Sequence, residues 1–263
     1  MQQNRRRWKI KTLYNKKMNT IIKGTNFQDG CIFLVDKPLE WTSFDVVNCL
    51  RIQICRALGV KKFKVGHAGT LDPLATGLLL ICTGKKTKEI DQLQNCDKEY
   101  TGTLKLGAIT PSYDGETEET QYFTTDHITT EMIHQAARRL TGHLEQVPPV
   151  FSAIKIGGKN AYIHARKGHE LKMAARPITI HSFEITEINL PYVSFRVRCS
   201  KGVYIRSLAH DFGKILDNGA YLTALRRTKI GNYSVEDAAT VEEMKEKILL
   251  PFKETRDNLS EVV

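Results

Sequence analysis

The sequence has few cysteines, and their positions argue against disulfide bonds and against zinc. Six cysteines are scattered over 263 residues, and no two of them have the CxxC spacing that structural zinc sites use. Isolated cysteines, several of them within apolar runs, are typical of free thiols in a reducing compartment. We therefore expect a cytoplasmic protein with no metal site.

Long apolar runs are also missing. No stretch approaches the roughly 18 apolar residues of a membrane-spanning helix. The N-terminus is charged, but the apolar core of a secretory signal does not follow it. Hydrophobic residues make up 41% and charged residues 26%, which is ordinary for a globular protein of one large or two small domains. We expect no contact with a membrane.

Acidic residues are absent from the first 17 positions, which hold seven lysines and arginines. The whole chain has a formal net charge of +10, so removing these seven leaves +3 for the remainder. Such a segment is either a nucleic-acid-binding arm or a solvated leader, and Met18 is an alternative start. We interpret residues 1–29 as a basic, disordered N-terminal extension.

The most informative segment extends from Lys64 to Lys88 and reads KVGHAGTLDPLATGLLLICTGKKTK. Pro73 disfavours a helical conformation at Asp72, and the apolar run 78–82 predicts a buried strand. Asp72 is therefore expected on a fixed loop before that strand, where a catalytic carboxylate can be held in place. Taken alone, Asp72 is more simply a turn residue before proline.

Apolar periodicity predicts the surrounding elements. It favours strands over 31–35, 98–107, 178–188 and 192–200, and helices over 44–58, 130–140, 204–216 and 240–250. Hairpins dominate and no regular βαβ alternation occurs, which predicts an α/β (α+β) fold with a mixed, mostly antiparallel sheet and flanking helices. Residues 111–125 are polar and turn-rich, which predicts a mobile loop around Asp114.

The segment GHAGTLDPLATGLL, followed by GKKTK, resembles the signature of the TruB family of pseudouridine synthases. More than a dozen positions match, so the signal is far more specific than a single glycine motif. Further segments resemble other blocks of the family in the same order. They are DKPLEWTSFDVV, in which Glu40 stands at the family's glycine, VPPVFSAIKIGGKNAYIHARKG, SKGVYIRSLAHDFG and AYLTALRRT.

The resemblance implies a pseudouridine synthase fold with a central active-site cleft, formed by a catalytic domain over residues 30–250 and followed by a tail over 251–263. It implies that uridine at position 55 in the T-loop of tRNA is isomerised to pseudouridine without a cofactor. Asp72 would be the essential catalytic carboxylate and Arg206 its ionic partner. The expected partner is the T-arm stem-loop of tRNA, and the expected state is a monomer.

The same resemblance implies the residues that bind the substrate. His67 enters the T-loop, Tyr100 stacks on the target base, Tyr204 closes the pocket and Leu225 lines it. Lys155 belongs to a basic patch that holds the RNA backbone. Without the resemblance, these positions are a surface histidine, two packed tyrosines, a core leucine and a solvated lysine.

Gly102 and a group of basic residues extend the expected binding site. Gly102 lies on the same face of its strand as Tyr100, so we expect it to leave space for a planar ligand. The other members of the basic patch are Lys159, Arg166 and Lys167. Many relatives carry a C-terminal RNA-binding domain of the PUA type, for which this sequence is too short.

Three other functions fit the sequence less well. One is a pseudouridine synthase with another RNA target, of which those acting on guide-RNA-selected sites are longer and carry an extra domain. A tRNA-folding chaperone without catalysis would not need Asp72, Tyr100 and Arg206 together. A metal-dependent nuclease would need clustered carboxylates near Asp72, and the only candidates, Asp36 and Asp45, have better structural roles.

Overall fold

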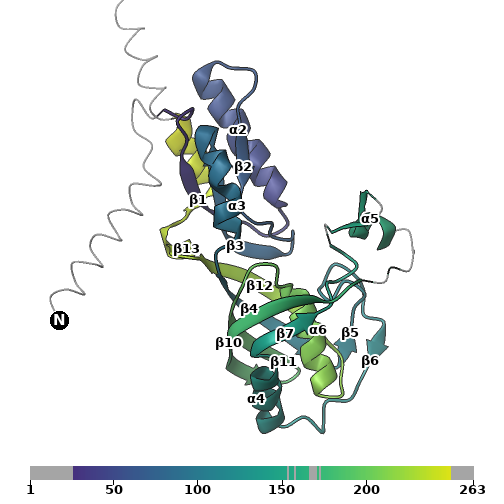
Figure 1. The fold of residues 1–263 in the computed structure, drawn as a ribbon. Coiled ribbons are helices and arrows are strands. Elements are labelled where there is room, and N and C mark those ends of the chain that lie inside the picture. Colours follow the sequence, from purple (N-terminus) through teal and green to yellow (C-terminus); the bar gives the residue numbers. More distant parts are fainter. Residues whose placement is uncertain (1–25, 153, 157, 166–170, 172, 250–263) are drawn as a thin grey trace, which may run out of the picture. The chain divides into compact units, whose positions relative to one another are not determined.

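The computed structural model describes residues 26–249 except 153, 157, 166–170 and 172 (Figure 1). The chain forms two compact units, one made of Met1–Cys96 and Arg226–Val263 and the other of Asp97–Leu225. The first unit is therefore discontinuous in sequence. Arg166 and Lys167 of the predicted basic patch, and the predicted extension up to residue 25, lie outside the described residues.

The first unit is built on strand β3 (Ala75–Thr83). Strand β1 (Ile32–Lys37) pairs with β3 in antiparallel register, and β14 (Ala239–Thr240) pairs with β1 in parallel. Strand β2 (Val65–His67) pairs with β3, and β13 (Tyr233–Ser234) pairs with the end of β12 (Ala220–Ile230). Strands therefore arrive from both ends of the chain to complete this unit.

Both faces of β3 are buried, which explains its continuous apolar run. One face packs with helix α2 (Ser43–Leu58) and helical residues 241–249, in a cluster that includes Leu79, Ile81, Leu50 and Met244. The other face packs in a separate cluster with Leu93 and Ile230. A strand without a polar face cannot show period-two alternation, so only its length and composition identified it.

Helix α2 begins with a capping box. The Thr42 side chain accepts from the Asp45 amide, and the Asp45 carboxylate accepts from the Thr42 amide. Gly59 ends the helix in the left-handed conformation. The 3₁₀ helix η1 (Gly84–Glu89), helix α3 (Ile90–Gln94) and the 3₁₀ helix η2 (Val235–Asp237) complete this unit.

The second unit contains four antiparallel strands in the order β4 (Lys98–Leu106), β11 (Tyr192–Cys199), β10 (Arg176–Asn189) and β7 (Gly142–Gln146). Helices α4 (Thr130–Arg139) and α6 (Ile205–Ile215) belong to the same unit (Figure 1), and both carry buried side chains. The Phe183 ring contacts the rings of Phe195 and Phe212, which joins β10, β11 and α6 in one core.

Smaller elements of this unit are two hairpins and a short helix. The first hairpin pairs β5 (Ala108–Ile109) with β6 (Gln121–Tyr122), and the second pairs β8 (Lys155–Ile156) with β9 (Lys159–Asn160). Helix α5 (Ala161–Ala165) follows the second hairpin.

The predicted fold class is confirmed, because both units combine helices with mostly antiparallel strands. Residues 111–125, predicted to form a mobile loop, instead include strand β6 and are hydrogen-bonded at several points, as the site below describes. Within the described part of the chain, no helix has the length and apolar character needed to cross a bilayer.

Candidate active site

Asp72 is half-buried on an irregular loop, between buried Leu71 and the turn that leads into β3. The amide of Ala75, the first residue of β3, donates to the carbonyl of Asp72 at 3.1 Å. The loop is thus tied to the central strand of its unit. The predicted placement of Asp72 on a fixed loop before a buried strand is confirmed.

Arg227 holds the first part of this loop. Its side chain is 1% exposed, and its Nη2 and Nη1 atoms donate to the carbonyls of Gly69 at 3.0 Å and Thr70 at 3.3 Å. Its Nε donates to the carbonyl of Leu78 at 2.8 Å. A guanidinium presents its donors in a rigid fork, so it fixes the loop and the strand relative to each other.

Ser43 holds the middle of the loop. Its buried hydroxyl donates to the Leu71 carbonyl at 3.0 Å and accepts from the Leu71 amide at 2.8 Å. Ser43 is the first residue of α2, so the helix that packs on β3 also carries the residue that binds the loop. Both backbone groups of the residue before Asp72 are satisfied in this way.

Lys37 holds the end of the loop. Its side chain is fully buried, and its Nζ donates to the carbonyls of Pro38, Trp41 and Pro73 at 2.8, 2.6 and 3.3 Å. Every carbonyl from Gly69 to Pro73 therefore accepts a hydrogen bond, counting the bond from Ala75 to Asp72. The loop is set before any substrate arrives.

Two buried cations bind the backbone on either side of Asp72, Arg227 at Gly69 and Thr70 and Lys37 at Pro73. Burial lowers the pKa of Lys37 to about 8, while the Asp72 charge acts in the opposite direction and Arg227 adds to the lowering. Burial, followed by the Arg227 charge, also lowers the pKa of His67, so this imidazole is neutral at physiological pH. His67 is half-buried at the end of β2, and within the described residues its Nδ1 has no hydrogen-bond partner.

Glu40 keeps the glycine-like geometry of its turn. Its φ is 66°, which side chains with a Cβ rarely adopt. Its amide donates to the Pro73 carbonyl at 2.8 Å. The hydrogen bond from the Glu40 amide to the Asp72 loop thus offsets the unfavourable positive φ of Glu40.

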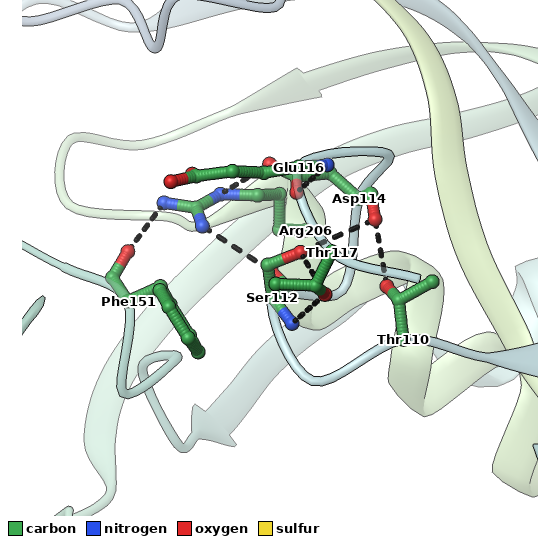
Figure 2. Close-up of polar contacts among 7 residues, drawn as sticks. All are labelled: Thr110, Ser112, Asp114, Glu116, Thr117, Phe151 and Arg206. Carbon is green, nitrogen blue, oxygen red and sulfur yellow. Dashed lines mark hydrogen bonds and ion pairs between the residues drawn. The ribbon is translucent and has the colours of Figure 1, made fainter. Parts of the chain in front are cut away.

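The second unit holds a buried ion pair between Arg206 and Asp114. The side chains are 6% and 7% exposed, and Arg206 Nε lies 3.6 Å from Asp114 Oδ2. Figure 2 shows the guanidinium also donating to two backbone carbonyls, of Ser112 at 3.2 Å and Phe151 at 2.8 Å. Removing one member of a buried ion pair typically costs about 3–5 kcal/mol.

Asp114 is fixed by its own loop. The Thr110 and Ser112 hydroxyls donate to its carbonyl, and its Oδ1 accepts from the Glu116 amide at 3.0 Å (Figure 2). The sequence had suggested Asp72 as the partner of Arg206, and this remains a prediction. Asp114 as a partner was missed. The sequence feature that could have indicated a fixed Asp114 is the group of hydroxyl residues around it, in TPSYDGET.

The remaining expected site residues of this unit lie on different elements. Tyr100 is buried on β4, while Leu225 is half-buried on β12. Tyr204, half-buried at the start of α6, is bracketed by Gln146, which accepts from its amide at 2.8 Å and donates to its carbonyl at 3.1 Å. Lys155 is exposed on the β8–β9 hairpin.

One expectation about the pocket was wrong. Gly102 does not leave space for a ligand, because a Cβ there would lie 2.7 Å from both the Phe195 ring and the Ala224 carbonyl. Phe195 is the cross-strand partner of Gly102. The glycine instead allows close packing of its neighbours.

Within the described residues, no group of three or more His, Cys, Asp or Glu side chains could hold a metal ion.

Comparison with known proteins now gives the family. The model of the TruB family pseudouridylate synthase N-terminal domain matches residues 56–205, and that of the tRNA pseudouridylate synthase B C-terminal domain matches residues 206–263. The chain belongs to the TruB family. The TruB N-terminal model includes the Asp72 loop and ends one residue before Arg206.

Curated TruB relatives cover most of the chain. It is 56% identical over 216 residues to tRNA pseudouridine synthase B of Flavobacterium johnsoniae, covering 82% of this chain and 94% of the relative. It is 54% identical to the protein of that name from Phocaeicola vulgatus, covering 84% of this chain and 94% of the relative.

Solved structures support the predicted TruB-like fold. A structure of an H/ACA RNP bound to a substrate RNA containing 2'-deoxyuridine matches with a TM-score of 0.59 and 27% identity over 84% of this chain. A Cbf5–Nop10–Gar1 complex matches with a TM-score of 0.61 and 27% identity, also over 84%. This chain covers 53% and 60% of those two chains.

Proposed function

We propose that this protein isomerises uridine to pseudouridine at position 55 in the T-loop of tRNA, with Asp72 as the catalytic residue. The observation that carries the proposal is the Asp72 loop, in which each carbonyl from Gly69 to Pro73 accepts a hydrogen bond. The backbone that carries the carboxylate is thus preorganised, so it needs little rearrangement at the moment of reaction.

The reaction itself is balanced without another reactant. The bond between C1' of the ribose and N1 of the base breaks, the base turns, and C1' forms a bond to C5. The proton on C5 leaves and a nitrogen of the base gains one, so the product has the same composition as the substrate. The uridine must first leave its stack, which costs a few kcal/mol, and tRNA contacts supply this free energy.

The other site residues have supporting roles in this proposal. Tyr100, on β4, stacks on the flipped base, and Tyr204, at the N-cap of α6, and Leu225, on β12, enclose it. Neutral His67 enters the T-loop, where an uncharged ring can pack against bases. Exposed Lys155 contacts phosphate. The catalytic region comprises residues 30–250, and the protein works as a cytoplasmic monomer.

The test is release of tritium from C5 of the target uridine. A pre-folded T-arm hairpin labelled at C5 gives a direct signal, since the C5 proton is lost only when the new bond forms. Asp72→Asn should abolish release while hairpin binding stays within about threefold. Asp91→Asn is the matched control, because Asp91 is an exposed aspartate of the same unit and should keep full activity.

Three further outcomes separate the alternatives. Binding and refolding of tRNA by the wild type, without any tritium release, would identify a chaperone instead of an enzyme. Loss of release on treating the hairpin assay with a chelator, restored by one specific metal, would contradict a mechanism based on protein groups alone. Release from another RNA but not from the T-arm would refute the proposed target.

A further inference from the structure

An aromatic pair lies next to the buried ion pair of the second unit. The rings of Tyr113 and His210 are stacked, with centroids 3.9 Å apart and planes at 10°. Tyr113 directly precedes Asp114, and His210 lies four residues after Arg206 on α6. Residues i and i+4 lie on the same face of a helix. The loop and the helix therefore meet at the ring stack, at the Arg206–Asp114 ion pair and at the hydrogen bond from Arg206 to the Ser112 carbonyl.

The backbone of Tyr113 is in a conformation that tyrosine does not favour. Its φ is 62°, in the left-handed region where glycine and asparagine are usual. Its amide donates to the Thr110 carbonyl at 3.1 Å, and its carbonyl accepts from the Leu222 amide at 3.0 Å. Glycine would suit this backbone better, so the ring is the feature that explains a tyrosine here.

His210 offers its ring face and makes little use of its polar atoms. It is half-buried, and its Nδ1 is buried with no hydrogen-bond partner in the described part of the chain. An unsatisfied buried nitrogen is unfavourable, so the site retains histidine at some cost. Burial, with a smaller effect of Lys214, lowers the pKa of His210 to about 4, so the ring is neutral at physiological pH.

We propose that the Tyr113–His210 stack is a positioning element for uridine isomerisation: it fixes the loop on α6 so that the Asp114 carboxylate stays against Arg206. This inference rests on the proposed function. The loop bonds to the Asp114 carbonyl set its backbone, but they act within the loop itself. The stack joins the loop to the helix that carries Arg206. Tyr113 and His210 touch no reacting atom in this proposal.

The first test removes each ring and then restores its face. Tyr113→Gly suits the backbone and deletes the ring, while Tyr113→Phe keeps the ring. His210→Ala and His210→Phe form the second matched pair. We expect both truncations to lower the single-turnover rate at saturating hairpin by about tenfold or more, with Kd changed by less than about twofold. Both Phe variants should recover at least about a third of the wild-type rate.

A double-variant cycle separates positioning from general packing. The stack acts through Asp114, so Tyr113→Gly should lower the rate in the wild type but have little further effect in Asp114→Asn. Multiplication of the two losses would overturn the proposal, because it would mean that the stack acts elsewhere. Unchanged rates in both truncations would overturn it as well.

An RNA-free measurement keeps this inference separate from the proposed function. Solvent exchange of the Arg206 Nε proton can be followed by NMR without substrate. We expect exchange at least about tenfold faster in Tyr113→Gly and His210→Ala than in the two Phe variants. Equal exchange in all four variants would overturn the proposed positioning role of the stack. If exchange responds as expected but the wild type releases no tritium, the proposed function alone fails.

Discussion

Replacing Ser43 with alanine should disable the Asp72 loop while leaving the rest of its unit folded. The substitution removes one oxygen, which binds both the amide and the carbonyl of Leu71. Alanine is a good residue for a helix interior, so α2 itself loses nothing. Only the connection between the helix and the loop is cut.

The expected magnitude follows from those two bonds. A net contribution of about 1 kcal/mol for each hydrogen bond gives about 2 kcal/mol of lost stability, and burial of the unpaired groups raises this to about 3. Asp72 follows Leu71 directly, so its carboxylate should sample several positions. A loss of about tenfold in single-turnover rate corresponds to about 1.4 kcal/mol in the barrier.

Thr42→Ala is the matched control. Thr42 is the neighbouring residue, is exposed, and makes its side-chain bonds to Asp45 in the capping box of the same helix. Removing an N-cap costs about 1 kcal/mol, so this variant should also be less stable. Its turnover should nevertheless equal that of the wild type, since the Thr42 hydroxyl caps helix α2 and makes no bond to the Asp72 loop.

The assay combines urea unfolding with tritium release from a saturating T-arm hairpin. Ser43→Ala should lose both stability and rate, and Thr42→Ala only stability. A wild-type rate for Ser43→Ala would refute the reasoning, because the Asp72 geometry would then not depend on this bond. Equal loss of rate in both variants would also refute it, since the effect would then follow stability in general.

Three further outcomes can be checked with the same protein. Glu40→Gly should raise the free energy of unfolding by about 1 kcal/mol in urea titrations, because it relieves a positive φ, and Glu40→Ala should not. Tyr100→Phe should keep near-normal turnover if stacking alone matters, whereas Tyr100→Ala should lose about 1–3 kcal/mol of base binding; wild-type rates for Tyr100→Ala would place this residue outside the pocket. The third concerns His210, whose pKa is about 4 in the fold and 6.5 ordinarily, so the unfolded chain takes up a proton first and stability falls as pH decreases from 6.5 to about 4. Because His210 is partly exposed, we expect this loss of stability to be about 1–2 kcal/mol, and His210→Phe should not show it. The raised pKa of Asp211 changes stability in the opposite direction, but it does so in both proteins.

The elements around Asp72 were predictable because each has a local signal. The break at Pro73, the apolar run of β3 and the capping residues of α2 all lie within a few positions of the feature that they determine. Family motifs added the expected roles of Tyr100 and Arg206, which remain predictions. Short-range patterns of this kind can be recognised in a sequence without any knowledge of tertiary contacts.

The bonds that hold the loop were not predictable. Ser43 and Leu71 are 28 residues apart, and Arg227 and Gly69 are 158 apart. Their acceptors are backbone carbonyls, which every residue carries and which leave no mark in a sequence. The error at Gly102 has the same origin, because the register of β4 against β11 decides that Phe195 fills the space beside it.

The discontinuity of the first unit also sets an order of events during synthesis. The Asp72 loop is made early, but Arg227, which holds two of its carbonyls, is translated more than 150 residues later. Strand β14, Val241 and Met244, which complete the β1 side of the core, come later still. Domains generally fold as units as the chain emerges from the ribosome. A nascent chain therefore carries the Asp72 motif long before Arg227 is available to shape the loop and before residues 239–248 complete the core beneath it.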